Sequence, residues 1–247
     1  MTKKYDLSSA SLHILAMFFM FCDHLWGTIL PWEWLTCVGR LAFPIFAFMI
    51  VEGYYHTHNL RRYILRLLIL AILSEIPFNL LYVGTLFYLF HQNVIWTFLI
   101  GLLLICLIEH SKKSGKKWIV CLVSFAAIVI GFLAGFVVIS DYYGTGVLTV
   151  LVFYFFRGRK WWNFLGQLIC LYVINFEMLG GLYYPIILFG HEFELLRQGL
   201  AILALIPIWL YRGRQGYHTK AFQYFCYAFY PVHMLLIVLV WKSLLHS

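Results

Sequence analysis

The stretch WIVCLVSFAAIVIGFLAGFVVIS, residues Trp118–Ser140, decides the class of fold. It carries no charge and is longer than the about 20 apolar residues that a helix needs to cross a bilayer. The whole chain is similar: 63% of its 247 residues are hydrophobic, 11% are charged, and the mean hydropathy is +0.86. Soluble domains have about 45–50% apolar and about 25% charged residues. We therefore expect an all-α, polytopic transmembrane helix bundle that forms one domain over residues 1–247.

Nine apolar runs predict about nine spans. The runs are Ser9–Leu30, Leu35–Tyr55, Tyr63–Val83, Asn93–Ile108, Trp118–Ser140, Gly144–Phe156, Trp162–Phe189, Leu196–Tyr211 and Phe222–Leu244. The seventh run contains the pair Gly180-Gly181, and glycine pairs mark turns. A break there would give ten spans.

The basic residues set the expected topology. The net charge is +8, from 18 Lys and Arg against 10 Asp and Glu. Clusters between the runs, starting with Lys3 and Lys4, fall in alternate connections, and Lys and Arg concentrate on the cytoplasmic side of membranes. This pattern favours nine crossings with a cytoplasmic N-terminus, in a bacterial cytoplasmic membrane. The excess of basic residues is then explained by the orientation of the protein in the lipid bilayer, and we expect no nucleic-acid partner. The oligomeric state is left open.

Reactive side chains are sparse and scattered. The six cysteines all lie within apolar runs and form no CxxC pair, which predicts buried free thiols. No spacing typical of metal ligands, and no phosphate-binding loop, occurs in the chain. We therefore expect no metal.

Charged residues inside apolar runs are costly in a bilayer, so each is a functional candidate. Asp23 and His24 are adjacent in the first run, and neighbouring residues of a helix point about 100° apart. One of them can pair with a neighbouring helix while the other lines a cavity. Arg40, at the start of the second run, is a candidate partner for Asp23. A neutral imidazole suits His24 to act as a general base, although a structural Asp–Arg pair with a bystander histidine is the alternative.

Arginines gather at the inner end of the second and third runs. Arg61, Arg62 and Arg66 follow Glu52, and Arg62 and Arg66 share one helix face. One interpretation is a topology-setting cluster with a Glu52–Arg66 pair. The other is an anion site, because arginine binds phosphate well.

Further polar residues have two interpretations each. Glu75 and Asn79 flank a proline one turn apart, as a structural kink or as a pair lining a cavity. Asn93 begins a run, as a helix cap or a ligand group. Asp141 lies in a turn, and His233 lies in the last run; both are either structural or substrate-binding.

Short motifs occur in order along nearly the whole chain. They are the DH pair, GRLAFPIFAFMIVEG at Gly39–Gly53, the T-x-N-x-x-x-Y-x-x-R stretch Thr57–Arg66, PFN at Pro77–Asn79, the N-x-x-x-T-x-x-x-G stretch Asn93–Gly101, DYYGTGVL at Asp141–Leu148 and YPVH at Tyr230–His233. In these motifs the chain resembles the TraX family of integral membrane proteins, which is associated with acetylation of a pilin N-terminus. The family is similar in turn to the transmembrane acyltransferases.

The resemblance implies roles for particular residues. In those acyltransferases a histidine of the first span is catalytic, which corresponds to His24 here, and an arginine and a late histidine correspond to Arg40 and His233. A Y-N-G motif of the superfamily reads Tyr211-Arg212-Gly213 in this chain, so the role of that asparagine does not carry over.

The implied function is acetyl transfer from acetyl-CoA to the N-terminal amine of a small membrane or exported peptide. Catalysis is assigned to His24, Asp23 and Arg40, with Asp23 or Asn79 orienting the imidazole and Arg40 or Asn93 stabilising the oxyanion. Acetyl-CoA binding is assigned to Arg61, Arg62, Arg66, Asn79 and Asn93, and substrate binding to Glu52, Asp141 and His233. O-acetylation of a cell-wall glycan or lipid is an alternative, as is a transporter or assembly protein.

Overall fold

The computed structural model describes residues 6–188 and 190–245, and it confirms the all-α class. Within this part of the chain, six helical segments are long and apolar enough to cross a membrane: Ser9–Trp26, Glu33–His56, Leu60–Tyr82, Val94–Lys112, Lys117–Val137 and Lys220–Leu244. Two shorter apolar helices, Tyr143–Phe155 and Arg197–Leu210, coincide with the sixth and eighth runs. The number of crossings therefore stays a prediction. Lys3 and Lys4 lie outside the described residues.

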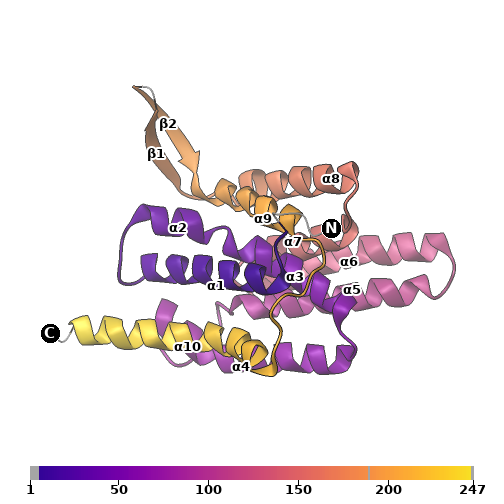
Figure 1. Ribbon diagram of the computed structural model, residues 1–247, viewed down its shortest axis with the longest axis horizontal. Helices are drawn as coiled ribbons and strands as arrows, with labels where there is room; N and C mark the ends of the chain where they lie inside the picture. The colour runs from indigo at the N-terminus through magenta and orange to yellow at the C-terminus, as the bar shows by residue number, and fades with distance from the viewer. Residues whose placement is uncertain (1–5, 189, 246–247) are drawn as a thin grey trace. The chain divides into compact units, whose positions relative to one another are not determined.

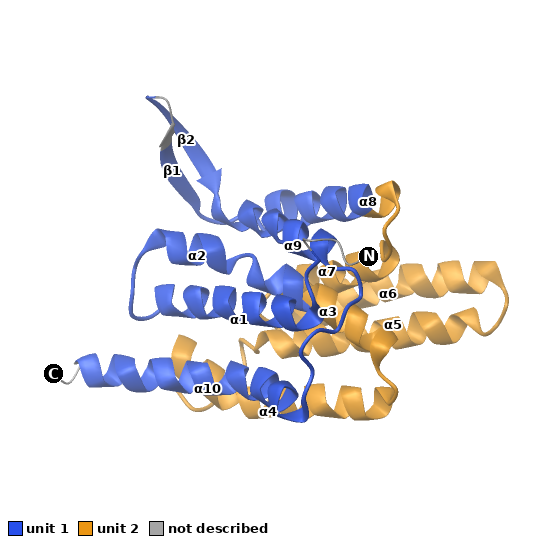
Figure 2. Ribbon diagram, in the orientation of Figure 1, with its two compact units in different colours: residues 1–46, 164–247 blue, residues 47–163 orange. Residues whose placement is uncertain are grey.

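The chain divides into two compact units (Figure 2). Unit 1 comprises residues 1–46 and 164–247, and unit 2 comprises residues 47–163. Helices α3 (Ala42–His56) and α8 (Trp161–Tyr172) each contain a unit boundary.

Unit 1 is built around α1 (Ser9–Trp26), which packs against α2 (Glu33–Gly39) and α10 (Lys220–Leu245) (Figure 1). Ser8 caps α1, because its hydroxyl accepts a hydrogen bond from the Ser11 N–H at 3.1 Å. Gly39 allows the close approach of α2: a Cβ at that position would collide with the Asp23 side chain. The packing of α1 thus depends on a small residue, as is common between membrane helices.

The seventh apolar run differs from the expected span. Helix α8 continues into a π-helix, η1 (Val173–Met178), and the helical path ends at Gly180 and Gly181, whose φ angles are +55° and +122°. These left-handed values are ones that glycine adopts without strain. The chain then forms an antiparallel hairpin of β1 (Tyr183–Leu188) and β2 (His191–Leu196), which extends beyond the helices of unit 1 (Figure 1). The expected break is therefore present, but a hairpin follows it instead of a tenth span.

The hairpin returns the chain to the helices of unit 1. A 3-10 helix, η2 (Arg197–Ala204), follows β2 and leads into α9 (Leu205–Leu210). This order matters for the site, because the first two residues of η2 contribute polar side chains next to α2.

Unit 2 is a bundle of α4 (Leu60–Tyr82), α5 (Val94–Lys112), α6 (Lys117–Val137) and α7 (Tyr143–Phe155). Asn93 caps α5, since its side-chain oxygen accepts a hydrogen bond from the Ile95 N–H. Close packing again uses glycines: a Cβ at Gly101 would meet Val150, and one at Gly135 would collide with the backbone of Tyr143. Pro77 lies inside α4, which continues past it.

Candidate functional site

The polar residues of α1 bond in two different directions within unit 1. Both carboxylate oxygens of Asp23 accept hydrogen bonds from Nη2 of Arg40, at 2.6 and 2.7 Å, and Oδ1 also accepts one from the Thr36 hydroxyl at 2.9 Å. The predicted Asp23–Arg40 pair is confirmed. His24, the next residue, bonds instead to His233 of α10. The divergence of about 100° between neighbouring helical residues explains how one dipeptide links α1 to both α2 and α10.

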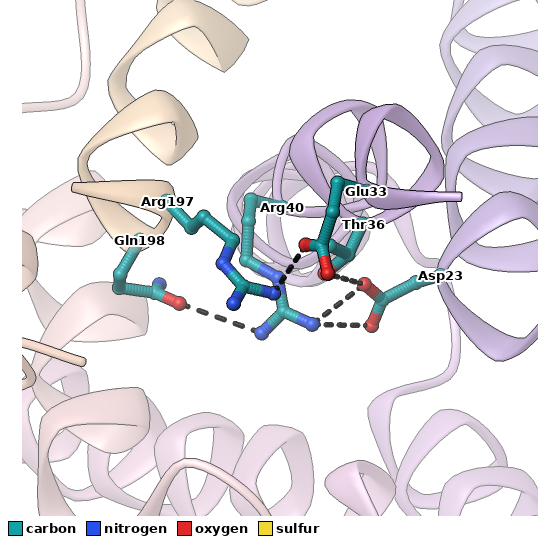
Figure 3. A network of polar contacts seen from close by, with 6 residues as sticks. All are labelled: Asp23, Glu33, Thr36, Arg40, Arg197 and Gln198. Carbon is teal, nitrogen blue, oxygen red and sulfur yellow. Dashed lines mark hydrogen bonds and ion pairs between the residues drawn. The ribbon is translucent and has the colours of Figure 1, made fainter. Parts of the chain in front are cut away.

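The Asp23–Arg40 pair belongs to a longer polar network (Figure 3). Nη1 of Arg40 lies 3.5 Å from the side-chain oxygen of Gln198 in η2, and Gln198 donates a hydrogen bond to Asn175 of the π-helix at 2.8 Å. Asn175 in turn donates to the carbonyl of Leu171. The network therefore ties the end of α2 to η2 and to η1. π-Helical turns occur frequently at functional sites.

A second ion pair lies beside this network. Nη1 of Arg197 in η2 is 2.7 Å from Oε2 of Glu33 in α2, and the guanidinium lies over the ring of Trp26, 5.3 Å from its centre. Figure 3 shows the two arginines with their respective carboxylates. Each positive charge has an acidic partner, so this side of α1 is electrically balanced rather than strongly basic.

The histidine pair has a defined arrangement of hydrogens. Nδ1 of His233 is 2.6 Å from the carbonyl oxygen of Phe229, and a carbonyl only accepts, so this nitrogen carries the hydrogen. In the neutral ring Nε2 of His233 is then an acceptor. Nε2 lies 2.6 Å from Nδ1 of His24, which must donate. The lone pair of the neutral His24 ring is consequently on Nε2, the nitrogen that a general base would use.

Both histidines are shielded from solvent. His24 is 8% exposed and His233 is 3% exposed. Their rings are nearly parallel, with centres 4.8 Å apart. The ring of Phe229 stacks on that of His233, also with centres 4.8 Å apart. Tyr230 lies against both. An aromatic enclosure of this kind restricts the rings and excludes water.

A scan against protein-family models matches the description "TraX protein" over residues 8–241. The chain belongs to the TraX family. The TraX match covers both histidines and the Asp23–Arg40 pair. A curated relative, the probable fimbrial assembly protein FimC of serogroup H1 from Dichelobacter nodosus, is 31% identical over 142 residues. That match covers 52% of this chain and 58% of the relative. No solved structure matches the chain.

The structure changes the expected role of two TraX motif residues in unit 1. Asp23 does not orient the imidazole through Nδ1 of His24, because that nitrogen bonds to His233 and the Asp23 carboxylate bonds to Arg40 and Thr36. His233, expected to bind substrate, forms a hydrogen bond with Nδ1 of His24.

The TraX motif residues Asn79 and Asn93 lie in unit 2, in a cluster with Glu75. Nδ2 of Asn93 donates to the carbonyl of Ala71 at 2.9 Å and also to Glu75. Because its donors are engaged and its oxygen caps α5, the cap interpretation of Asn93 is confirmed, and a role as an oxyanion donor is not supported. Asn79 is 3% exposed and lies in a different unit from His24.

Glu52 and Asp141 both have partners within unit 2. Oε1 of Glu52 accepts a hydrogen bond from Nε of Arg157 at 2.7 Å, so the Glu52–Arg66 pair, one of the two interpretations of this cluster, is wrong. Asp141 lies 3.3 Å from Nε2 of His91, in the connection before α5. The hydrogen bond to Asp141 raises the pKa of His91 above its ordinary value, although partial burial opposes the shift.

The three arginines at the start of α4 are exposed, as an anion site would require. Arg62 and Arg66 are one turn apart, and the guanidinium of Arg66 lies 5.9 Å from the ring centre of Tyr63. Among the described residues, no three His, Cys, Asp or Glu side chains are grouped to hold a metal ion.

Several residues of the site were not identified from the sequence. Thr36, Asn175 and Gln198 are uncharged, so an inventory of charges within apolar runs does not find them. Glu33 lies in the connection before the second run and Arg197 at the edge of the eighth, so neither stands out as a charge deep within a run. Their positions in the first turns of η2 and α2 are the signal that connects them, and this signal requires the hairpin to be known.

Proposed function

We propose that this protein is a membrane acetyltransferase that uses acetyl-CoA to acetylate the N-terminal amine of a small membrane or exported peptide. The observation that supports the proposal most directly is the ordered chain from the Phe229 carbonyl through His233 to His24. It leaves the lone pair of His24 on Nε2 in a site that excludes water. Membership of the TraX family is the second support.

In this proposal His24 acts as the general base. The acceptor nitrogen attacks the thioester carbonyl, and Nε2 of His24 takes the proton that this nitrogen loses. The tetrahedral intermediate collapses, the C–S bond breaks, and the imidazolium returns the proton to the thiolate. The products are the N-acetyl peptide and coenzyme A. His233 stabilises the imidazolium because its Nε2 accepts the hydrogen bond from Nδ1 of His24 throughout.

The other residues support this chemistry indirectly. Asp23 and Arg40 fix α1 against α2, which sets the direction in which His24 points. Within unit 2, the exposed group of Arg61, Arg62 and Arg66 is a candidate site for phosphate groups, such as those of coenzyme A, since guanidinium groups bind phosphate in a bidentate manner. Asn79 and Asn93 have no role toward acetyl-CoA in this proposal, because Asn79 is buried and the side chain of Asn93 bonds within unit 2.

The acceptor class rests on the comparisons. The curated relative is named as a probable fimbrial assembly protein, which suggests an acceptor among the subunits of a surface fibre. We therefore propose the N-terminus of such a subunit, exported through the same membrane, as the acceptor.

The test uses the purified protein in nanodiscs with acetyl-CoA and a synthetic peptide that has the N-terminal sequence of a pilin-like subunit from the same organism. Mass spectrometry of the peptide and release of free thiol are followed together. His24→Ala should lower turnover by about 10²–10⁴-fold, the typical contribution of a general base. The matched control is His13→Ala, another histidine of α1, which bonds only one turn back to the Ser9 carbonyl and should retain activity. Full acetyl transfer by folded His24→Ala protein would refute the proposal.

A further inference from the structure

The carboxyl group of Glu75 in unit 2 has an unusual distribution of hydrogen bonds. Its Oε1 accepts from Nε1 of Trp96 at 2.6 Å, from the backbone N–H of Asn93 at 3.3 Å, and from the Asn93 side chain. Its Oε2 is buried and has no hydrogen-bond partner among the described residues. A buried oxygen without a partner is costly, and the cost is larger for a charged group.

A second buried oxygen without a partner lies one helical turn away. Asn79 is 3% exposed, and its Oδ1 has no partner among residues 6–188 and 190–245. The orientation of the amide is set by Nδ2, which faces the carbonyl of Leu86 at 3.5 Å. Flipping the amide would place two oxygens against each other. Residues four apart share a helix face, so Asn79 and Glu75 point to the same side of α4.

We propose that Glu75 is a proton-binding site whose bound proton sits on Oε2 and is shared with Oδ1 of Asn79. A single hydrogen then satisfies both buried oxygens, because a protonated carboxyl group has one O–H donor. Oε1 remains the carbonyl oxygen and keeps its three donors. The group is neutral, which suits a side chain in a membrane-spanning helix. This inference is independent of the proposed acetyl transfer, since it concerns unit 2 alone.

The surroundings favour a proton over a larger cation. The charged groups near Glu75 are His91 and Asp141, which pair with each other at 3.3 Å. No Lys or Arg forms an ion pair with Glu75 among the described residues. Two convergent oxygens are enough for a proton, whereas cations such as Ca²⁺ take six to eight oxygen ligands.

The decisive variant is Glu75→Gln. A glutamine reproduces the protonated form: its oxygen accepts from Asn93 and Trp96, and its N–H donates to Asn79. We expect the melting temperature of this variant in detergent to stay within about 3 °C of the wild type, a shift of order 1 kcal/mol or less. Glu75→Ala should melt at a lower temperature because it removes both sets of hydrogen bonds. Failure of Glu75→Gln to fold, or a large drop in its melting temperature, would show an ionised carboxylate and overturn the proposal.

Infrared spectroscopy of the same proteins gives an independent readout. At pH 8 we expect the wild type to show the C=O band of a protonated carboxylic acid, and Glu75→Gln to lack it. The matched control is Glu52→Gln. The carboxylate of Glu52 is paired with Arg157 and should contribute no such band, so this variant should keep the band of the wild type. Absence of the band in the wild type would overturn the proposal. A rise in melting temperature with NaCl, but not with choline chloride, that disappears in Glu75→Gln would also overturn it, in favour of a sodium site.

Discussion

Replacing His233 separates the group that orients the base from the base itself. In the ground state the Nδ1–H of His24 donates to the neutral Nε2 of His233 at 2.6 Å, a bond with a net value of about 1 kcal/mol. When His24 becomes an imidazolium, the same bond is charge-assisted and has a value of about 1.5–3 kcal/mol. The difference, about 0.5–2 kcal/mol, acts only on the reacting state. We therefore expect His233→Ala to lower kcat by about 2–30-fold, since about 1.4 kcal/mol corresponds to tenfold.

The assay is steady-state acetyl transfer in nanodiscs, with acetyl-CoA varied to separate kcat from KM. KM should change little, because the lost bond does not contact the thioester in this mechanism. His233→Gln should recover part of the rate, as its amide oxygen accepts the hydrogen of Nδ1. A wild-type rate in folded His233→Ala would refute the relay. A loss as large as that of His24→Ala would instead place His233 among the reacting groups.

Three further perturbations test the packing and the charges. Gly39→Val should lower both activity and melting temperature, since a side chain there collides with Asp23 and separates α2 from α1; Gly39→Ser should be milder in a thermal-shift assay. Arg40→Ala should cost about 2–3 kcal/mol in denaturant unfolding, less than the 3–5 kcal/mol of a fully buried pair, because the two partners are 22% and 18% exposed; adding Asp23→Asn should restore part of the loss. The pKa of His91 is higher in the folded protein than in the unfolded chain, so its pairing with Asp141 stabilises the fold fully below about pH 6.5. This stabilisation is lost as the pH rises through the folded-state pKa. The melting temperature of the wild type should therefore fall over that pH range, whereas that of His91→Gln should not.

Local sequence information was sufficient for the class of fold and for one of the two links of α1. Charged residues in apolar runs are conspicuous, so Asp23 and Arg40 could be matched from their similar depth along consecutive runs. The pairing of His24 with His233 joins the first and last helices, which are 209 residues apart. Hydrophobic periodicity predicts the faces of helices but does not say which helices are neighbours. The relay could therefore not be predicted from the sequence alone.

The wrong pairing of Glu52 has a similar cause. Arg66 lies in the third run, next along the chain to the run of Glu52, whereas Arg157 follows α7 and reaches Glu52 through the fold of unit 2. The hairpin was missed because its first strand, β1, is as apolar as a span and continues the seventh run, whereas β2 carries Glu192 and Glu194 and reads as a connection. The glycine pair before Tyr183 predicts a break in the run but not a change of secondary structure.

The order of the adjacent residues Asp23 and His24 fixes the rotation of α1 about its own axis. Asp23 bonds to Arg40 at the end of α2, and His24 bonds to His233 of α10. A rotation of α1 about its axis must break one of these two interactions. Exchanging Asp23 and His24 would leave the composition and hydropathy unchanged, but the carboxylate would then face His233 and the imidazole would face Arg40. For this membrane protein the order of two adjacent letters, more than their presence, determines which way the first helix faces.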